Sequence, residues 1–114
     1  MDTGFSLVLV TVGSPEEGEK IGRSLVEKQL AVCVNLIPGM TSIYKWKGEI
    51  EKDTECLLVI KTKFRLFLDV KEEVLNGHSY DLPEIIELPI QNGFSEYLDW
   101  IDDNIKPLSS ETII

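Results

Sequence analysis

Residues 31–62 of the chain read AVCVNLIPGMTSIYKWKGEIEKDTECLLVIKT, and this stretch decides the fold. It holds two apolar runs, 31–37 and 55–62, separated by a segment, 41–47, in which apolar and polar residues alternate. Such runs are typical of β-strands. Pro38-Gly39 is a turn signal, so we expect the first strand to end there in a bend or a bulge. Because the segments follow one another closely, antiparallel pairing is the default arrangement.

The two central strands, together about Ala31 to Thr62, are longer than a domain of about 100 residues needs to cover two helices. Gly48 and the charged residues 49–53 are expected to form the turn between them. The surplus strand leaves an unpaired edge and exposes the aromatic side chains of Tyr44 and Trp46. Pairing with neighbouring subunits would cover both, so strand length predicts a homo-oligomer.

A strand and a helix precede this stretch. Residues 5–12 are β-branched and nearly continuous in apolar character, as in a strand covered on both faces. The following helix has a clear start, because Ser14 fits the N-cap, Pro15 the first helical position and Glu17 the third. One side of that helix is apolar and carries Ile21, Leu25 and Val26. A β-α unit therefore leads into the central strands.

A second helix and an edge strand follow the central strands. The helix is expected to open at Thr62 or Lys63 and to end at an Asn76-Gly77 cap. Between these ends, apolar residues recur at three- and four-residue steps, as on one face of a helix. Residues 84–90 alternate partly and are flanked by prolines, which suits a strand at the edge of a sheet.

A short amphipathic helix closes the ordered part of the sequence. It opens with Ser95 as its cap, stops at Pro107, and has an apolar side formed by Leu98, Ile101 and Ile105. The element order β-α-β-β-α-β plus a terminal helix is the ferredoxin-like arrangement of the α+β class, one antiparallel sheet with two helices on one face. We expect a single domain over residues 1–107 and a loose tail over residues 108–114.

The charge of the chain limits its partners. There are 20 acidic residues against 11 basic ones, which gives a net charge of −9 and a pI near 4.5. This balance argues against binding to nucleic acid or to an anionic membrane, and it permits cations as ligands. No run approaches the ~20 apolar residues of a membrane span. Cys33 and Cys56 lie in apolar runs without metal-site spacing, so we expect a cytoplasmic protein without disulfides.

The polar loop after the second helix is the strongest candidate for a site. His78, Tyr80, Asp81 and Glu84 lie within seven positions of one another. An imidazole with one or two carboxylates can bind Zn or Cu. The alternative is a capped helix end with solvated side chains and with Tyr80 packed on the core. Phosphate-binding, hydrolase and metalloprotease motifs are absent, and no thiol pairs with the single histidine, so we do not expect an enzyme.

Several blocks of the sequence resemble the CutA family, the divalent-cation tolerance proteins. The longest block is residues 31–50, AVCVNLIPGMTSIYKWKGEI. Further blocks, in the same order as in the family, are IKT at 60–62, HSYDLPEI at 78–85 and YLDWI at 97–101. The resemblance covers about residues 5–105. Separate motifs in the right order make it far more specific than any one of them.

This resemblance implies a ferredoxin-like subunit in a tight homotrimer, similar in architecture to the PII signalling proteins. It implies a cytoplasmic role in tolerance of divalent metals, copper among them, with metal cations and copies of the same chain as partners. The metal ligands implied by the H-x-Y-x-x-P-E block are His78 and Glu84, with Cu or Zn as the ion and no organic cofactor. Val10 stands where some members have a cysteine ligand, and Ser79 where proline is usual.

Two other functions remain open at this point. A PII-like regulatory module would bind a small anionic ligand between subunits, although the sequence lacks a glycine-rich loop that cradles phosphate. A hydrolase of the acylphosphatase kind would need a nucleophile or an anion-binding loop, and neither is visible. The residues that could serve the PII-like module are basic and aromatic: Lys45, Lys47, Lys61, Arg65, Tyr44 and Trp46.

Overall fold

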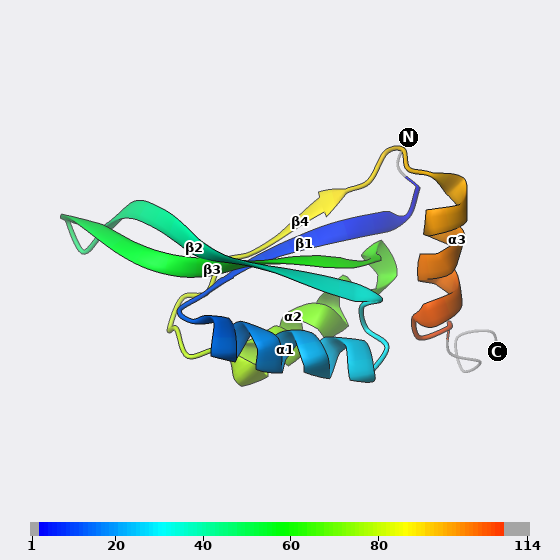
Figure 1. Ribbon diagram of the computed structural model, residues 1–114, viewed down its shortest axis with the longest axis horizontal. Coiled ribbons are helices and arrows are strands. Elements are labelled where there is room, and N and C mark those ends of the chain that lie inside the picture. The colour runs from blue at the N-terminus through cyan, green and yellow to red at the C-terminus, as the bar shows by residue number, and fades with distance from the viewer. Residues whose placement is uncertain (1–2, 109–114) are drawn as a thin grey trace.

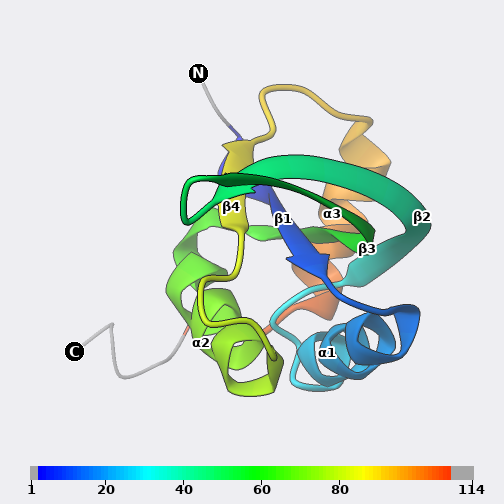
Figure 2. The same ribbon diagram turned by 90° about the vertical axis from the view of Figure 1, so that its left-hand side faces the viewer.

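A computed structural model describes residues 3–108 as one antiparallel sheet with helices packed against it (Figure 1). The strand order is β2-β3-β1-β4, and α1 and α2 cover the same face of the sheet (Figure 2). The predicted β-α-β-β-α-β order with a terminal helix is therefore confirmed. The elements are β1 (Phe5–Val12), α1 (Pro15–Glu27), β2 (Cys33–Trp46), β3 (Glu49–Lys63), a 3₁₀ turn (Phe64–Leu66), α2 (Phe67–Gly77), β4 (Ile85–Pro89) and α3 (Ser95–Asn104).

Strand β2 does not end where the turn signal predicts. It runs through Pro38 and Gly39 as one strand of 14 residues, with a shift of register between Ile37 and Met40. The predicted bulge is thus confirmed, and the predicted strand end is wrong. Gly39 has a φ of 76°, which a residue with a side chain rarely adopts. Proline is tolerated because β2 lies at the edge of the sheet, where a missing N–H costs no ladder bond.

The turn between β2 and β3 takes only two residues. Lys47 and Gly48 both have positive φ, 52° and 84°, as in the tight hairpin turn whose twist matches that of paired strands. Trp46 pairs with Glu49, so residues 49–53, predicted as a turn, are the first part of β3. The hairpin extends well past the helices (Figure 1), which gives the molecule its dimensions of 50 × 28 × 24 Å.

Helix α1 begins as predicted, and its glycines let it approach the sheet. The Ser14 Oγ accepts a hydrogen bond from the Glu17 N–H at 3.2 Å. A Cβ atom on Gly18 would lie 2.9 Å from Cδ2 of Leu58, closer than such atoms normally come. Glycine at this position therefore sets the distance between α1 and β3.

Three predicted helix ends need correction. The second helix does not open at Thr62 or Lys63, because Thr62 is fully buried in β3 and donates its hydroxyl hydrogen to a backbone carbonyl. A 3₁₀ turn instead precedes α2. Gly77 ends α2 without a positive φ, so it is not a left-handed cap. Ser95 is the first residue of α3 rather than its cap, and its hydroxyl donates to Glu96.

The core lies between the sheet and the helices, and α3 contributes to it. Ile101 and Ile105 are buried there, as predicted, together with Leu25, Leu58 and Val70. Strand β4 lies at the sheet edge, as predicted. Within residues 3–108, no helix is long and apolar enough to cross a membrane. The predicted loose tail falls mostly on residues 109–114, which lie outside the described residues.

Candidate functional site

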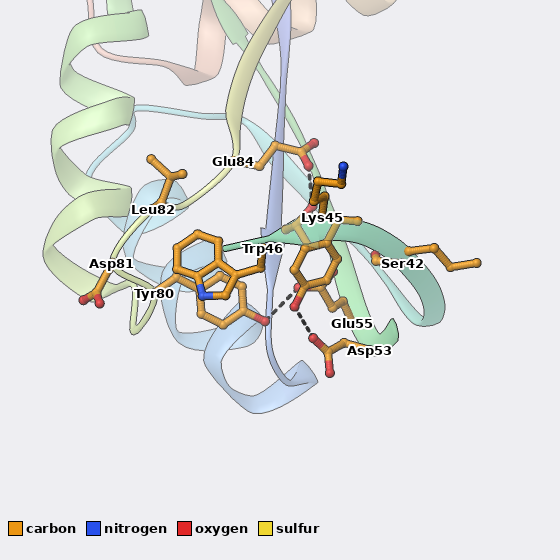
Figure 3. A pocket seen from close by; sticks show the side chains of 12 residues that line it. Ser42, Lys45, Trp46, Asp53, Glu55, Tyr80, Asp81, Leu82 and Glu84 are labelled. Atoms are coloured by element: carbon orange, nitrogen blue, oxygen red, sulfur yellow. Dashed lines mark hydrogen bonds between the residues drawn. The ribbon is translucent and has the colours of Figure 1, made fainter. Parts of the chain in front are cut away.

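A cavity of about 660 Å³ lies where the β2-β3 hairpin, the end of β1 and the loop at residues 78–84 meet (Figure 3). Its volume is within the range of small-molecule sites. One lysine, Lys45, is part of the wall. The other functional side chains are three aromatic rings and four carboxylates: Tyr44, Trp46, Tyr80, Asp53, Glu55, Asp81 and Glu84.

The alternation of β3 explains why acids line this cavity. Cys56 and Leu58 point into the core, so Asp53 and Glu55 belong to the opposite face of the strand. The register places Tyr44 of β2 opposite the residue two positions before Asp53, which brings its ring over the acids. The two strands of the hairpin therefore supply acids and aromatic rings to one surface.

Two phenols donate hydrogen bonds to two carboxylates inside the cavity. The Tyr80 hydroxyl donates to Oε2 of Glu55 at 2.8 Å, and the Tyr44 hydroxyl donates to Asp53 (Figure 3). The hydrogen bond to Asp53 raises the pKa of Tyr44 to about 12. Burial, and then the bond to Glu55, raise the pKa of Tyr80. Both phenols therefore remain neutral donors at physiological pH.

His78 lies beside the cavity and is fixed by two hydrogen bonds. Its Nε2 is 2.7 Å from the carbonyl oxygen of Thr11, and its Nδ1 is 3.1 Å from the Tyr80 backbone N–H. A carbonyl can only accept and an N–H can only donate, so we assign the proton to Nε2 and a lone pair to Nδ1. Glu17 Oε2 lies 3.5 Å from Nδ1 and also accepts from the Ser79 N–H at 3.0 Å.

The two ligands expected from the family resemblance converge on one residue. His78 contacts the Thr11 carbonyl, and Oε1 of Glu84 accepts from the Thr11 hydroxyl at 3.2 Å. The His78 side chain is only 1% exposed, so a simply solvated loop does not describe it. Tyr80 is 37% exposed and is not a core residue either. Val10 is fully buried in β1.

The basic residues considered for an anionic ligand are dispersed. Lys61 contacts Asn35, and the Arg65 guanidinium donates to the backbone carbonyl of Lys106 at 2.7 Å. Lys47 lies over the Trp46 ring, 5.8 Å from its centroid. In the described part of the chain, these side chains form no common anion site.

Sequence reasoning missed Glu17, Asp53 and Glu55 as site residues. The sequence indicates only a capping role for Glu17, and the charged run at 49–53 is typical of a turn. The sequence does carry a signal that these acids share one face of a strand, because every second position from Glu49 to Glu55 is acidic. A period of two is typical of one strand face.

We expect Tyr44 to titrate at unusually high pH because of Asp53. In an alkaline titration followed by phenolate absorbance, Asp53→Asn should lower the pKa of Tyr44 from about 12 toward its ordinary value of 10.0. A raised pKa stabilises the fold below pH 10, and that contribution is lost as the pH rises through about 12. Tyr44→Phe identifies the transition, and Asp99→Asn on α3 is the control. An unchanged curve in Asp53→Asn would contradict the assigned hydrogen bond.

Comparison with known proteins identifies the family. A family model described as CutA1 divalent ion tolerance protein matches residues 6–104. The chain belongs to this family. It is 50% identical over 98 residues to the divalent-cation tolerance protein CutA of Thermus thermophilus, covering 86% of this chain and 95% of the relative. It is 43% identical to the chloroplastic protein CutA of Arabidopsis thaliana, covering 88% of this chain and 55% of that longer relative.

A solved CutA structure confirms the fold. The periplasmic divalent cation tolerance protein CutA from Archaeoglobus fulgidus superposes with a TM-score of 0.87 at 41% identity. The match covers 90% of this chain and 99% of the solved one. The resemblance read from the sequence blocks is therefore confirmed at the level of family and subunit fold.

Proposed function

We propose that this CutA family member is a homotrimeric, cytoplasmic protein that binds divalent metal ions, Cu or Zn, and acts in metal tolerance without catalysing a reaction. Family membership supports the general role, because the relatives are named for divalent-cation tolerance. The net charge of −9 and the four carboxylates of the cavity favour cations over anions as ligands. The scattered basic residues give no support to the anion-binding alternative.

The position of the His78 imidazole carries the metal-binding part of the proposal. A metal-binding histidine typically donates its second N–H to a carbonyl or a carboxylate, which fixes the lone pair on the other nitrogen. Here the Thr11 carbonyl fills that role at 2.7 Å, and Nδ1 holds the lone pair 3.5 Å from Glu17. A metal ion at Nδ1 would replace the Tyr80 N–H. Glu84, anchored on the Thr11 hydroxyl, is the second proposed ligand.

The donor set within one chain is small. Among the described residues, no group of three His, Cys, Asp or Glu side chains is assembled as a metal site. A bound ion would therefore keep water molecules, or ligands from another subunit, in its coordination shell.

The projecting hairpin supports the homotrimer. Ile43 and Ile50 are 70% and 78% exposed in the single subunit. An exposed apolar hairpin with an unpaired edge is a hazard for aggregation unless another chain covers it. A second and a third copy, as the family resemblance implies, would provide that cover.

The cysteines support a reducing compartment. Cys33 and Cys56 are both free thiols, and Cys56 is fully buried. Proteins of the cytoplasm typically keep their cysteines reduced. The chloroplastic and periplasmic relatives named above show that the compartment differs between members, so the cytoplasmic location is a proposal for this chain alone.

Calorimetric titration with Cu²⁺ and with Zn²⁺ tests the metal site. We expect His78→Ala to weaken binding by about tenfold or more, because loss of even a supporting group of a metal site costs that much. Glu84→Gln and Glu17→Gln then tell which carboxylate completes the site. Glu72→Gln, on the exposed side of α2, is the matched control. Equal binding by the wild-type protein and a folded His78→Ala variant would refute the proposal.

A further inference from the structure

The cavity beside His78 is too large for a metal ion alone. Its volume is about 660 Å³, whereas one water molecule occupies about 30 Å³ in the liquid. Three aromatic side chains, Tyr44, Trp46 and Tyr80, form part of its wall, and both phenol hydroxyls are engaged as donors to carboxylates (Figure 3). The cavity therefore has the size and the lining of a site for an organic molecule.

The aromatic rings present open surface to this space. Tyr44 and Trp46 come from β2 and Tyr80 from the loop, and the three residues are 40%, 42% and 37% exposed. The electron-rich face of such a ring attracts cations, and Trp attracts them most strongly. A cation already lies near one of these rings, because Lys47 Nζ is 5.8 Å from the Trp46 centroid.

Glu55 adds a buried negative charge. The residue is only 8% exposed, and its Oε2 accepts the Tyr80 hydroxyl at 2.8 Å. Among the described residues, its second oxygen, Oε1, has no hydrogen-bond partner. Every fully buried side-chain oxygen in residues 3–108 does have a partner, so Oε1 cannot be fully buried. Oε1 therefore retains accessible surface, and because Glu55 lines the cavity, that surface opens into it.

The balance of charge selects the sign of the ligand. The cavity wall carries four carboxylates and one lysine, so an anionic ligand such as a nucleotide would be repelled. An ammonium group can place its charge between the carboxylates and its carbon atoms against the rings. Aromatic side chains combined with an acid are the usual means of recognising such cations.

We propose that this cavity binds an organic ammonium cation, with Glu55 as its charged partner and the rings of Tyr44, Trp46 and Tyr80 against its apolar part. The site goes beyond the metal-binding function and does not depend on it. The proposed metal site is centred on His78 Nδ1, and His78 is not among the residues that line the cavity; the two proposed sites share Glu84 of its wall.

The two tryptophans provide a direct test. Trp46 lies in the cavity, whereas Trp100 is on α3 with a similar exposure, 42% against 45%. In NMR spectra of the full chain recorded with EDTA, benzylammonium should shift the indole N–H signal of Trp46 in a saturable manner and leave that of Trp100 in place. Trp100→Phe assigns the signals. Benzyl alcohol and benzoate, which have the same ring without the positive charge, should bind at least about tenfold more weakly.

A charge variant tests the role of Glu55. Glu55→Gln keeps an oxygen for the Tyr80 hydroxyl and removes the charge, so the dissociation constant for benzylammonium should rise about tenfold. Glu72→Gln should leave it unchanged. An unshifted Trp100 signal shows that each variant is folded. The proposal is overturned if benzylammonium leaves Trp46 unaffected, if benzyl alcohol binds as well, or if the two variants behave alike. Because EDTA removes metal ions, none of these results depends on the His78 site.

Discussion

Replacing Leu58 by alanine is expected to lower the free energy of unfolding by about 2–5 kcal/mol, the usual cost of such a truncation in a core. Leu58 is in the middle of β3, has no exposed surface, and lies directly beneath Gly18 of α1. Neither the sheet nor the helix can move in to fill the space, since other core contacts hold both. Urea denaturation at one fixed protein concentration measures the change, because assembly would otherwise shift the transition.

Two further variants make this prediction specific. Leu68→Ala, at a position 69% exposed on α2, should change the stability by less than about 0.5 kcal/mol. Gly18→Ala should strain the wild-type protein, because the new Cβ would lie 2.9 Å from the Leu58 side chain. In the Leu58→Ala background the 2.9 Å contact is removed while the 3.2 Å contact with Cγ2 of Val12 remains, so the better helix propensity of alanine should restore less than about 1 kcal/mol. Equal losses from Leu58→Ala and Leu68→Ala would contradict the described packing.

Replacing Ile50 by aspartate is expected to break the proposed homotrimer into single chains. Ile50 is 78% exposed near the tip of the hairpin, so the single subunit loses little when it becomes charged. In a homotrimer that covers the hairpin, three carboxylates would be buried without partners, each at a cost of several kcal/mol. Light scattering should then report the 12.9 kDa mass of one chain instead of three times that mass.

The matched control is Leu68→Asp, which adds the same charge at a position 69% exposed on α2, away from the hairpin. It should leave the assembly intact, and circular dichroism should show both variants folded. If the wild-type protein already scatters as one chain, or if both variants dissociate alike, the hairpin does not carry the subunit contact.

The sequence predicted the fold where the local signal and the tertiary environment agree. Ser14 caps α1 as expected, because a short hydroxyl side chain can reach the free N–H groups of a first turn in any surroundings. Thr62 shows the opposite case. The sequence predicts that the second helix opens at Thr62 or Lys63, but the buried Thr62 hydroxyl donates to the carbonyl of Leu30, 32 positions away in the sequence, and this contact keeps Thr62 in β3.

The candidate site could be predicted in part. His78 and Glu84 were singled out by their spacing and by the family resemblance, and both prove to contact Thr11, although their role as ligands stays a prediction. The acids of β3 are difficult to recognise as site residues, because a run of charged residues suggests a turn. The acids in that run recur at every second position, however, and this period indicates one face of a strand. Contacts of Glu17 and Glu55 with the loop depend on tertiary folding, so no local pattern reveals them.

Tyr80 makes two hydrogen bonds, one to a residue of the proposed metal site and one to a residue of the proposed ammonium site. Its backbone N–H donates to His78 Nδ1 at 3.1 Å, and its hydroxyl donates to Glu55 at 2.8 Å. A metal ion at Nδ1 would release the first hydrogen bond, and an ammonium ion at Oε1 of Glu55 would share a carboxylate with the second. One residue thus gives the two proposed sites a means of thermodynamic linkage. Reciprocity then requires that each ligand change the affinity of the other by the same factor, so a titration with one ligand reports on both.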